Sequence, residues 1–372
     1  MKTRTFKGGI HPKEMKELSR DCPITPAFPS SNTVTIPVTM GGAPNTPLVK
    51  VGDVVAKGQV IASGDKFMSV PVHASVSGKV KKIANFLTTG NAEVPCIVIE
   101  SDGSDTTAFM EPLDPFTCER TAALDRIKQA GIVGMGGASF PAHVKLNPPE
   151  DKDIEYVLVN AAECEPYLTA DHRLMVEYPE DVVFGIRVIM KALNVHKGYI
   201  AIEMNKPDAI EAITNAAKDY SEVEVVGLQV KYPQGAEKQL IYACTGREVP
   251  SGALPAAAGA VVDNVGTAAQ IAKTIKTGLP LIERITTVTG SCIKEPANLI
   301  TKVGTVVSEI IEQCGGFKED VKVGKFIMGG PMMGMAQYTT NIVTNKGSSG
   351  ILCISDEEAR LPQFSNCLRC GR

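Results

Sequence analysis

A loop rich in small residues, from Gly131 to Lys145, constrains this chain more than any other stretch. It reads GIVGMGGASFPAHVK, and residues without a bulky Cβ let backbone N–H groups approach a phosphate or a flat ring closely. The spacing does not match a P-loop, and it lacks the third glycine of the dinucleotide-binding pattern. The loop also follows a predicted helix, ERTAALDRIKQA, where a Rossmann turn would follow a strand. The alternative is a glycine-rich connection that binds nothing.

A second loop, with acidic residues, follows the next predicted strand. Residues 156–159, YVLV, form a continuous apolar run that is typical of a buried parallel strand. Asn160, Glu163 and Glu165 come soon after it, and ligands of open α/β sheets bind outside the carboxyl ends of the strands. Together with the glycine loop and its last residue, Lys145, this predicts a mononucleotide pocket. Taken alone, the acidic loop would favour a solvated turn.

Helix and strand patterns alternate from residue 119 to about residue 275. Pro179 and Pro207 each begin a predicted amphipathic helix, and the runs GYIAIEM and VEVVGLQV have the composition of strands. Short connections between such elements favour a parallel sheet with helices on its faces. We therefore expect an α/β domain at residues 119–284.

The N-terminal part, residues 1–118, has a different pattern. Prolines interrupt the first 30 residues, which we expect to form an irregular lead-in that wraps another domain. Short β runs separated by turn residues follow up to Glu100, and the similarity of VKVGDVVAKGQVIA to SVPVHASVSGKVKKI resembles a biotinyl or lipoyl barrel sandwich. Lys66 lies near the place of the modified lysine of that fold, but its Gly-Asp turn predicts an ordinary solvated residue.

The C-terminal part predicts a small α+β module at residues 285–352. A β pair precedes a helix there, and in the Gly/Met loop FIMGGPMMGMAQ the methionines 332, 333 and 335 favour pliant packing over a role as ligands. Cys367 and Cys370 form the C-x-x-C with which ferredoxin-type cluster motifs begin. Because two thiolates cannot complete a four-ligand cluster, we expect residues 353–372 to begin an iron–sulfur domain that is truncated in this chain.

Composition excludes several classes of protein. The net charge of −3 and the pI near 6.0 provide no basic surface for nucleic acid. The sequence has no apolar signal region and no run of about 18 apolar residues, so we expect a soluble fragment without a membrane span. The singly scattered cysteines 96, 244, 292 and 353 lie in apolar surroundings and are interpreted as small buried hydrophobic residues.

Both loops resemble a known family of flavoproteins. GIVGMGGASFPAHVK resembles the flavin loop of the 51-kDa NADH-oxidising subunit of respiratory complex I, and YVLVNAAECEPYLTADHRLM resembles the acidic loop that follows it there. YPQGAEKQL and VVDNVGTAAQI match two further stretches in the same order. FKGGIHP, the barrel-sandwich segment and FIMGGPMMG extend the resemblance over nearly the whole chain, to the C subunits of Rnf electron transport complexes, the ion-translocating ferredoxin:NAD oxidoreductases.

This resemblance implies an α/β fold with a Rossmann-like flavin domain, an N-terminal lipoyl-like β barrel-sandwich domain and a C-terminal β-grasp module that binds soluble ligands. It implies an NADH-dependent oxidoreductase subunit that is peripheral on the cytoplasmic side of the inner (plasma) membrane. Its partners would be the other Rnf subunits, ferredoxin through the complex, and NAD(H). Its cofactors would be FMN and NADH, with 4Fe–4S clusters only in the full-length protein. Hydride would pass between nicotinamide and flavin, followed by single electrons to iron–sulfur centres.

The resemblance also implies roles for individual residues. No side chain is implied as a catalytic acid or base, because hydride moves directly between stacked rings. The implied metal ligands are Cys367 and Cys370. The residues implied to line the flavin are Gly134, Gly136, Gly137 and Ala138, with Lys145, Asn160, Asn264 and Thr267 at the phosphate and ribityl chain. The residues implied on the dinucleotide side of the pocket are Phe140, Glu165 and Glu237, and Glu163 is a further implied cofactor-binding residue.

The sequence departs from the family pattern at two acidic steps, and two alternatives stay open. G-D-E-S is replaced by residues 161–164, AAEC, and G-E-E by residues 235–237, GAE. One alternative is the related cobalamin reductase of bacterial microcompartments. The other is a non-catalytic scaffold that binds no nucleotide, like the A subunit of the sodium-pumping quinone reductase. The direction of electron flow, the coupling ion and the choice of NADH or NADPH stay open as well.

Overall fold

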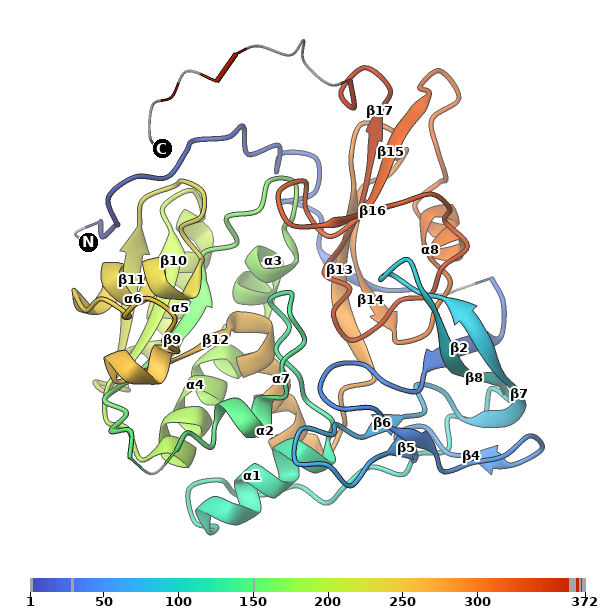
Figure 1. The fold of residues 1–372 in the computed structure, drawn as a ribbon, viewed down its shortest axis with the longest axis horizontal. Coiled ribbons are helices and arrows are strands. Elements are labelled where there is room, and N and C mark those ends of the chain that lie inside the picture. The colour runs from blue at the N-terminus through green and yellow to red at the C-terminus, as the bar shows by residue number, and fades with distance from the viewer. Residues whose placement is uncertain (1–2, 28–29, 150, 361–365, 368, 370–372) are drawn as a thin grey trace.

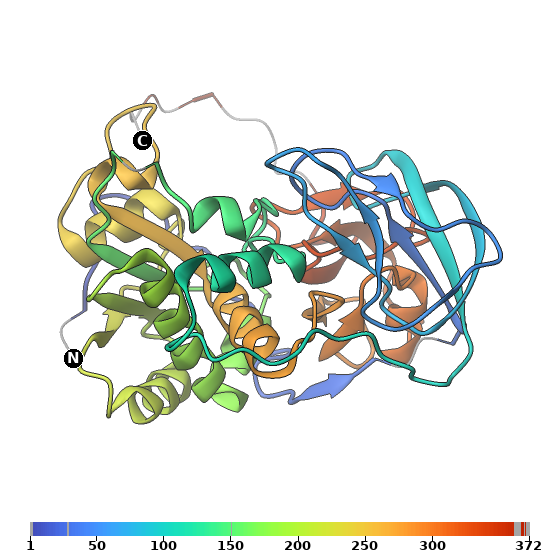
Figure 2. The same ribbon diagram turned by 90° about the horizontal axis from the view of Figure 1, so that it is seen from below.

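The computed structural model describes residues 3–27, 30–149, 151–360, 366–367 and 369. An α/β domain lies on one side of the molecule, and two β-rich modules lie on the other (Figure 1). Viewed from below, the same separation is visible (Figure 2). None of the helices in the described ranges combines the length and the apolar character needed to cross a membrane.

A four-stranded parallel sheet forms the centre of the α/β domain, as the alternating pattern predicts. The strand order is β11-β10-β9-β12, and every pair is parallel. Their carboxyl ends therefore meet at one edge, where β9 and β12 lie side by side. The strands are β9 (Tyr156–Ala161), β10 (Gly198–Glu203), β11 (Val223–Leu228) and β12 (Ala260–Asn264).

Helices cover both faces of this sheet because successive side chains of a strand point to opposite faces. Val157 and Val159 of β9 pack into the core that α4 and α7 cover, whereas Leu158 packs into the core under α6. The prolines at the starts of α4 and α5 confirm the predicted helix beginnings. The helices are α1 (Arg120–Gln129), α2 (Ala142–Lys145), α3 (Ala170–Glu177), α4 (Pro179–Leu193), α5 (Pro207–Ala217), α6 (Glu237–Thr245) and α7 (Val265–Thr277), with a 3-10 turn, η1 (Pro255–Ala258).

Two small sheets enclose a separate apolar core in the N-terminal module. One sheet has the order β2-β8-β7-β4 and the other β3-β5-β6, which is the expected barrel sandwich. Lys66 is exposed in a bend between β5 and β6, as its turn composition predicts. The strands are β2 (Thr33–Pro37), β3 (Thr46–Pro47), β4 (Val54–Val55), β5 (Val60–Ser63), β6 (Val72–His73), β7 (Gly78–Leu87) and β8 (Glu93–Ser101).

The C-terminal module is a mixed sheet with one helix, α8 (Val307–Gln313), packed against it. The sheet has the order β1-β14-β13-β17-β15-β16. Its last strand in sequence, β17, runs past residue 352, where the predicted C-terminal module ends. β1 belongs to the N-terminal lead-in, which therefore does wrap other parts of the chain. The strands are β1 (Ile24–Pro26), β13 (Glu283–Thr289), β14 (Ala297–Lys302), β15 (Val323–Met328), β16 (Met335–Gln337) and β17 (Gly350–Ser355).

Candidate functional site

A cavity of about 700 Å³ opens at the carboxyl edge of the parallel sheet. Asn160 at the end of β9 and Asn264 at the end of β12 line it, together with the glycine loop. The opposite wall comes from the C-terminal module, and Thr89 of the barrel-sandwich module lines it too. All three modules thus meet at this cavity. Of the twelve predicted cofactor-binding residues, those that line it are Gly136, Gly137, Asn160, Glu163, Glu165 and Asn264.

The glycine loop turns sharply where it reaches the cavity. Gly137 has a φ of 135°, a conformation that side chains with a Cβ rarely adopt, and no atom lies within 4 Å of its missing Cβ. Gly134 does not line the cavity, and its N–H donates a hydrogen bond to the Phe140 carbonyl oxygen at 2.8 Å. Ala138 and Phe140 are exposed beside the cavity and do not line it.

The beginning of α7 lies directly below this loop. Asn264 caps the helix, because its Oδ1 accepts a hydrogen bond from the Gly266 N–H at 2.9 Å. Its Nδ2 donates to Asp171 Oδ2 at 2.8 Å. Thr267 is buried one turn into the helix, and its Oγ1 accepts a hydrogen bond from the Met135 N–H at 2.9 Å. The positive end of a 13-residue helix therefore supports the loop, which favours an anion in this part of the cavity.

Lys145 and Glu237 form a pair outside the cavity lining. Lys145 Nζ lies 2.8 Å from Glu237 Oε1 and donates to the Val262 carbonyl at 2.9 Å. Burial alone would lower the pKa of Lys145, but the carboxylates of Asp263 and Glu237 raise it above its ordinary value. Burial raises the pKa of Asp263 to about 6 although Lys145 is near.

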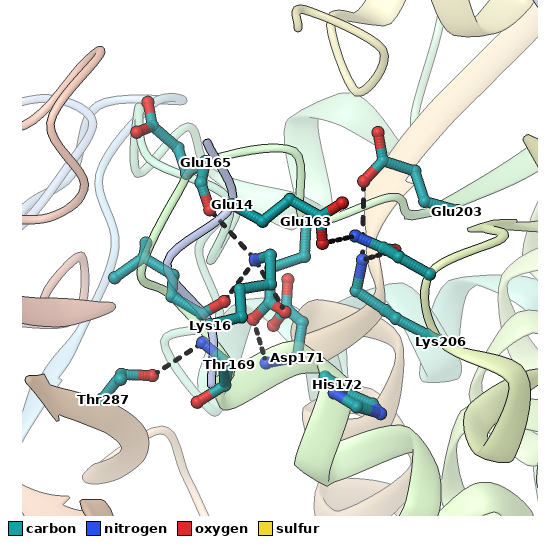
Figure 3. A network of polar contacts seen from close by, with 12 residues as sticks. Glu14, Lys16, Glu163, Glu165, Thr169, Asp171, His172, Glu203, Lys206 and Thr287 are labelled. Atoms are coloured by element: carbon teal, nitrogen blue, oxygen red, sulfur yellow. Dashed lines mark hydrogen bonds and ion pairs between the residues drawn. The ribbon is translucent and has the colours of Figure 1, made fainter. Parts of the chain in front are cut away.

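Glu163 is a buried carboxyl group of the cavity wall. It has a φ of 48°, its Oε1 accepts the Asp171 N–H at 2.7 Å, and its Oε2 lies 3.5 Å from Lys16 Nζ. Burial raises the pKa of Glu163 to about 7. Figure 3 shows Lys16 reaching Glu163 from the N-terminal segment, with Glu203 and Lys206 beside them. Lys206 is also buried, and its Nζ donates a hydrogen bond to the Ala162 carbonyl oxygen at 2.7 Å. Two buried cations, Lys16 and Lys206, therefore hold the acidic loop.

Glu165 connects the acidic loop to the C-terminal module. Its Oε2 accepts the Met332 N–H at 3.1 Å, and burial raises its pKa above the ordinary value. Gly330 allows this close approach, since a Cβ there would lie 2.2 Å from Glu165 Oε2 and would displace the glutamate side chain. The side chains of Met332 and Met333 are 38% and 80% exposed. The prediction that these methionines serve as packing is therefore wrong, because the tight contact between the two loops turns them outward to the rim of the cavity.

Several cavity residues escape the sequence reasoning. Asp171 and Tyr232 line the cavity from within two matched stretches, YVLVNAAECEPYLTADHRLM and YPQGAEKQL, so a residue-by-residue comparison of those stretches could have found them. Lys16 gives no such signal, because its partner Leu168 is 152 positions away. Met335 and Asn345 also line the cavity, and only the packing of the C-terminal module brings them there.

The predicted metal ligands lie at the end of the chain. Cys367 is exposed, and Cys370 lies outside the described residues. Within the described residues, no group of three or more His, Cys, Asp or Glu side chains could hold a metal ion. The singly scattered cysteines 96, 244, 292 and 353 are buried, as predicted.

Three family models match the chain, one in each module. Residues 4–104 match the RnfC barrel sandwich hybrid domain, residues 127–273 the Nuo51 FMN-binding domain, and residues 285–336 the SLBB domain. These matches confirm the expected α/β fold with its N-terminal barrel sandwich and its C-terminal β-grasp module. The chain also resembles the NAD+-reducing [NiFe]-hydrogenase in its air-oxidized state, at 18% identity and a TM-score of 0.52 over 64% of this chain and 47% of that chain. At that identity the likeness shows a shared fold, and the chain spans about half the length of that structure's chain.

Curated relatives match over the whole length. The C subunit of the Na+-translocating ferredoxin:NAD+ oxidoreductase complex of Acetobacterium woodii is 51% identical over 100% of this chain and 84% of the relative. Its counterpart in the proton-translocating complex of Clostridium ljungdahlii is 49% identical over 99% and 80%. The counterpart in the ion-translocating oxidoreductase complex of Rhodobacter capsulatus is 41% identical over 99% and 71%. The chain therefore belongs to the family of C subunits of ion-translocating ferredoxin:NAD oxidoreductase complexes, the Rnf complexes.

Proposed function

We propose that this chain is the NADH- and FMN-binding electron-transfer subunit of an Rnf-type complex. It exchanges hydride between NAD(H) and FMN and passes single electrons on to iron–sulfur clusters and ferredoxin. One observation carries the proposal: the glycine loop and the capped start of α7 face one cavity at the carboxyl edge of a parallel sheet, inside the stretch that matches an FMN-binding domain.

The residues of the cavity fit a flavin mononucleotide. A volume of about 700 Å³ lies within the usual range of cofactor sites, and the glycines at 136 and 137 leave room for a ring or a phosphate. Two buried carboxylate oxygens, Glu163 Oε2 and Glu165 Oε1, have no hydrogen-bond partner among the described residues. Such acceptors are suited to the hydroxyl and N–H groups of a ribityl chain, a ribose or a flavin ring. FMN, when bound, supplies the hydride and single-electron chemistry.

The residues of the chain bind and orient the cofactor and shield it from water. Asn160 is held for this role, since its Nδ2 donates to the Gly235 carbonyl at 2.7 Å and its Oδ1 accepts the Ala162 N–H at 3.2 Å. Gly134 and Thr267 act through the loop that they shape, and Lys145 acts through its pair with Glu237. Met333 and Met335 belong to the wall that the C-terminal module contributes. Ala138 and Phe140 flank the opening on the side where NADH enters.

The remaining assignments rest on the family. The relatives are named as subunits of ion-translocating complexes, which supports the other Rnf subunits as partners. A peripheral place on the cytoplasmic side of the membrane is part of this proposal. Cys367 and Cys370 would supply two thiolates to a 4Fe–4S site.

Titration of the purified chain tests the function. FMN should give a yellow 1:1 complex that NADH bleaches. Gly137→Trp should abolish FMN binding because the side chain projects from the cavity wall, whereas Asn215→Trp, on the exposed end of α5, should bind FMN normally. Circular dichroism would verify that both variants fold. A colourless protein that FMN cannot reconstitute would support the scaffold alternative and end this proposal.

A further inference from the structure

Two buried cations, Lys346 and Arg284, donate hydrogen bonds to backbone carbonyls of the glycine loop. Lys346 Nζ donates to the Gly131 carbonyl at 2.7 Å, and Arg284 Nη2 donates to the Met135 carbonyl at 3.1 Å. Both residues lie in the C-terminal module: Arg284, which the sequence placed at the end of the α/β domain, lies on β13 of the C-terminal sheet, and Lys346 lies in the segment between β16 and β17. The loop that lines the cavity is therefore shaped by the C-terminal module.

The two cations act as one unit. Arg284 Nη1 donates to the carbonyl oxygen of Lys346 at 2.7 Å, so the guanidinium also fixes the backbone of the lysine. Lys346 Nζ donates to the Pro71 carbonyl at 2.8 Å as well, which ties in the barrel-sandwich module. Gly131 makes this approach possible, because a Cβ there would lie 2.6 Å from Lys346 Nζ. One fully buried ammonium group thus joins all three modules at the first residue of the loop.

The positive charge of Lys346 is not neutralised by an ion pair within the described residues. Within the described residues no carboxylate forms an ion pair with it, and carbonyl dipoles are its hydrogen-bond partners. His73 of the barrel-sandwich module lies beside it, and burial, together with the lysine's charge, lowers the pKa of that imidazole to about 3. Arg284 carries the second positive charge, and Asp171 provides the carboxylate that faces the guanidinium. Burial lowers the pKa of Lys346 to about 7 and that of Arg284 to about 10.

We propose that Lys346 and Arg284 are positioning residues of the cofactor site: they hold the glycine loop by its inward carbonyls in the shape that accepts the cofactor, and their charge favours an anionic ligand above it. The proposal rests on the function proposed above, which makes FMN the ligand. Because Lys346 loses its proton near neutral pH, it also makes FMN affinity depend on pH. The charged form is present below about pH 7, so affinity should fall as pH rises from 6.5 to 8.5.

Flavin titrations with matched variants test the proposal. Lys346→Met keeps the volume and removes the charge, and it should weaken FMN binding at least tenfold at pH 6.5. At pH 8.5, where the wild-type lysine is largely neutral, the difference should shrink to about threefold. Arg284→Met should weaken binding more than tenfold at both pH values, and Arg284→Lys should restore most of the loss. Lys231→Met is the control, since Lys231 is also buried and also donates to two carbonyls, those of Phe6 and Gly8, but outside the cavity.

Hydrogen exchange of residues 131–139 gives a readout that does not need FMN. Lys346→Met and Arg284→Met should speed exchange there at least tenfold, and Lys231→Met should not. If Lys346→Met binds FMN like the wild type and leaves exchange unchanged, the positioning role is wrong. A weakened affinity that stays equally weak at pH 6.5 and 8.5 would refute the part played by charge. If the wild type binds no FMN but exchange changes as expected, the proposed function fails and the loop-positioning role stands.

Discussion

At the scale of single residues, Glu163 combines burial with charge. It lies at the wall of the cavity, its backbone is in the left-handed region, and its nearest cation, Lys16, is 3.5 Å away. The sequence indicates this glutamate as a site residue because it follows a buried strand. The sequence does not predict that burial raises the pKa of Glu163 to about 7 against the opposing effect of Lys16. Both the burial and the position of this lysine depend on how the N-terminal segment packs.

Glu163→Gln should therefore change the pH dependence of stability. The folded-state pKa is about 7 and the ordinary value is 4.5, so the folded state binds the extra proton between these values and wild-type stability falls as pH rises through this window. The variant lacks this loss and should gain on the wild type between pH 5 and pH 8, by at most about 3 kcal/mol. Urea unfolding at the two pH values measures the difference. Glu211→Gln, exposed on α5, should show no such trend, and a pH-independent difference for Glu163→Gln would contradict the assignment.

At the scale of elements, α4 and α7 cross closely, and α7 begins directly after Asn264, which lines the cavity. Pro179 and the apolar pattern predict α4, and the structure confirms it. What the pattern cannot show is that Gly185 of α4 lies directly on the backbone of α7, where a Cβ would be 2.0 Å from the Ala268 carbonyl oxygen. A glycine inside a helix usually costs stability, and here it allows the approach.

Gly185→Ala should accordingly destabilise the protein although alanine favours helices. The clash with backbone cannot be relieved by a rotamer change, so we expect a loss of about 2–4 kcal/mol in the free energy of unfolding. Gly90→Ala is the matched control, because its Cβ would meet only Thr88 Oγ1 at 4.0 Å, and it should change stability by less than about 1 kcal/mol. Denaturant unfolding of both variants checks this, and a neutral Gly185→Ala would show that the helices can separate without cost.

At the scale of the whole molecule, the cavity is a meeting point of three modules. Thr89 comes from the barrel sandwich, Asn160 from the α/β domain and Met335 from the C-terminal module. The N-terminal segment adds a strand to the C-terminal sheet and sends Lys16 beneath the acidic loop. A ligand in this cavity would contact all of these parts at once.

FMN should therefore stabilise the molecule as a single unit. At a free concentration one hundred times its dissociation constant, a ligand that binds only the folded state adds about 2.7 kcal/mol to the free energy of unfolding. Calorimetry with and without FMN should show the whole transition move upward. A transition that splits, with one module melting at an unchanged temperature, would show that this module does not contribute to the site.

The sequence by itself determined the elements, the fold class, the family and the two loops of the proposed cofactor site, because these depend on local periodicity, turn residues and motif spacing. Tertiary structure decided which predicted residues face the cavity. It turned Lys145 toward Glu237 and away from the cavity and exposed the methionines of the C-terminal loop. It also brought Lys346 and Arg284 to carbonyls of the glycine loop more than 100 positions away. The physical reason is that a buried charge is placed by the carbonyls and carboxylates that compensate its lost hydration, and these partners come from distant parts of the chain.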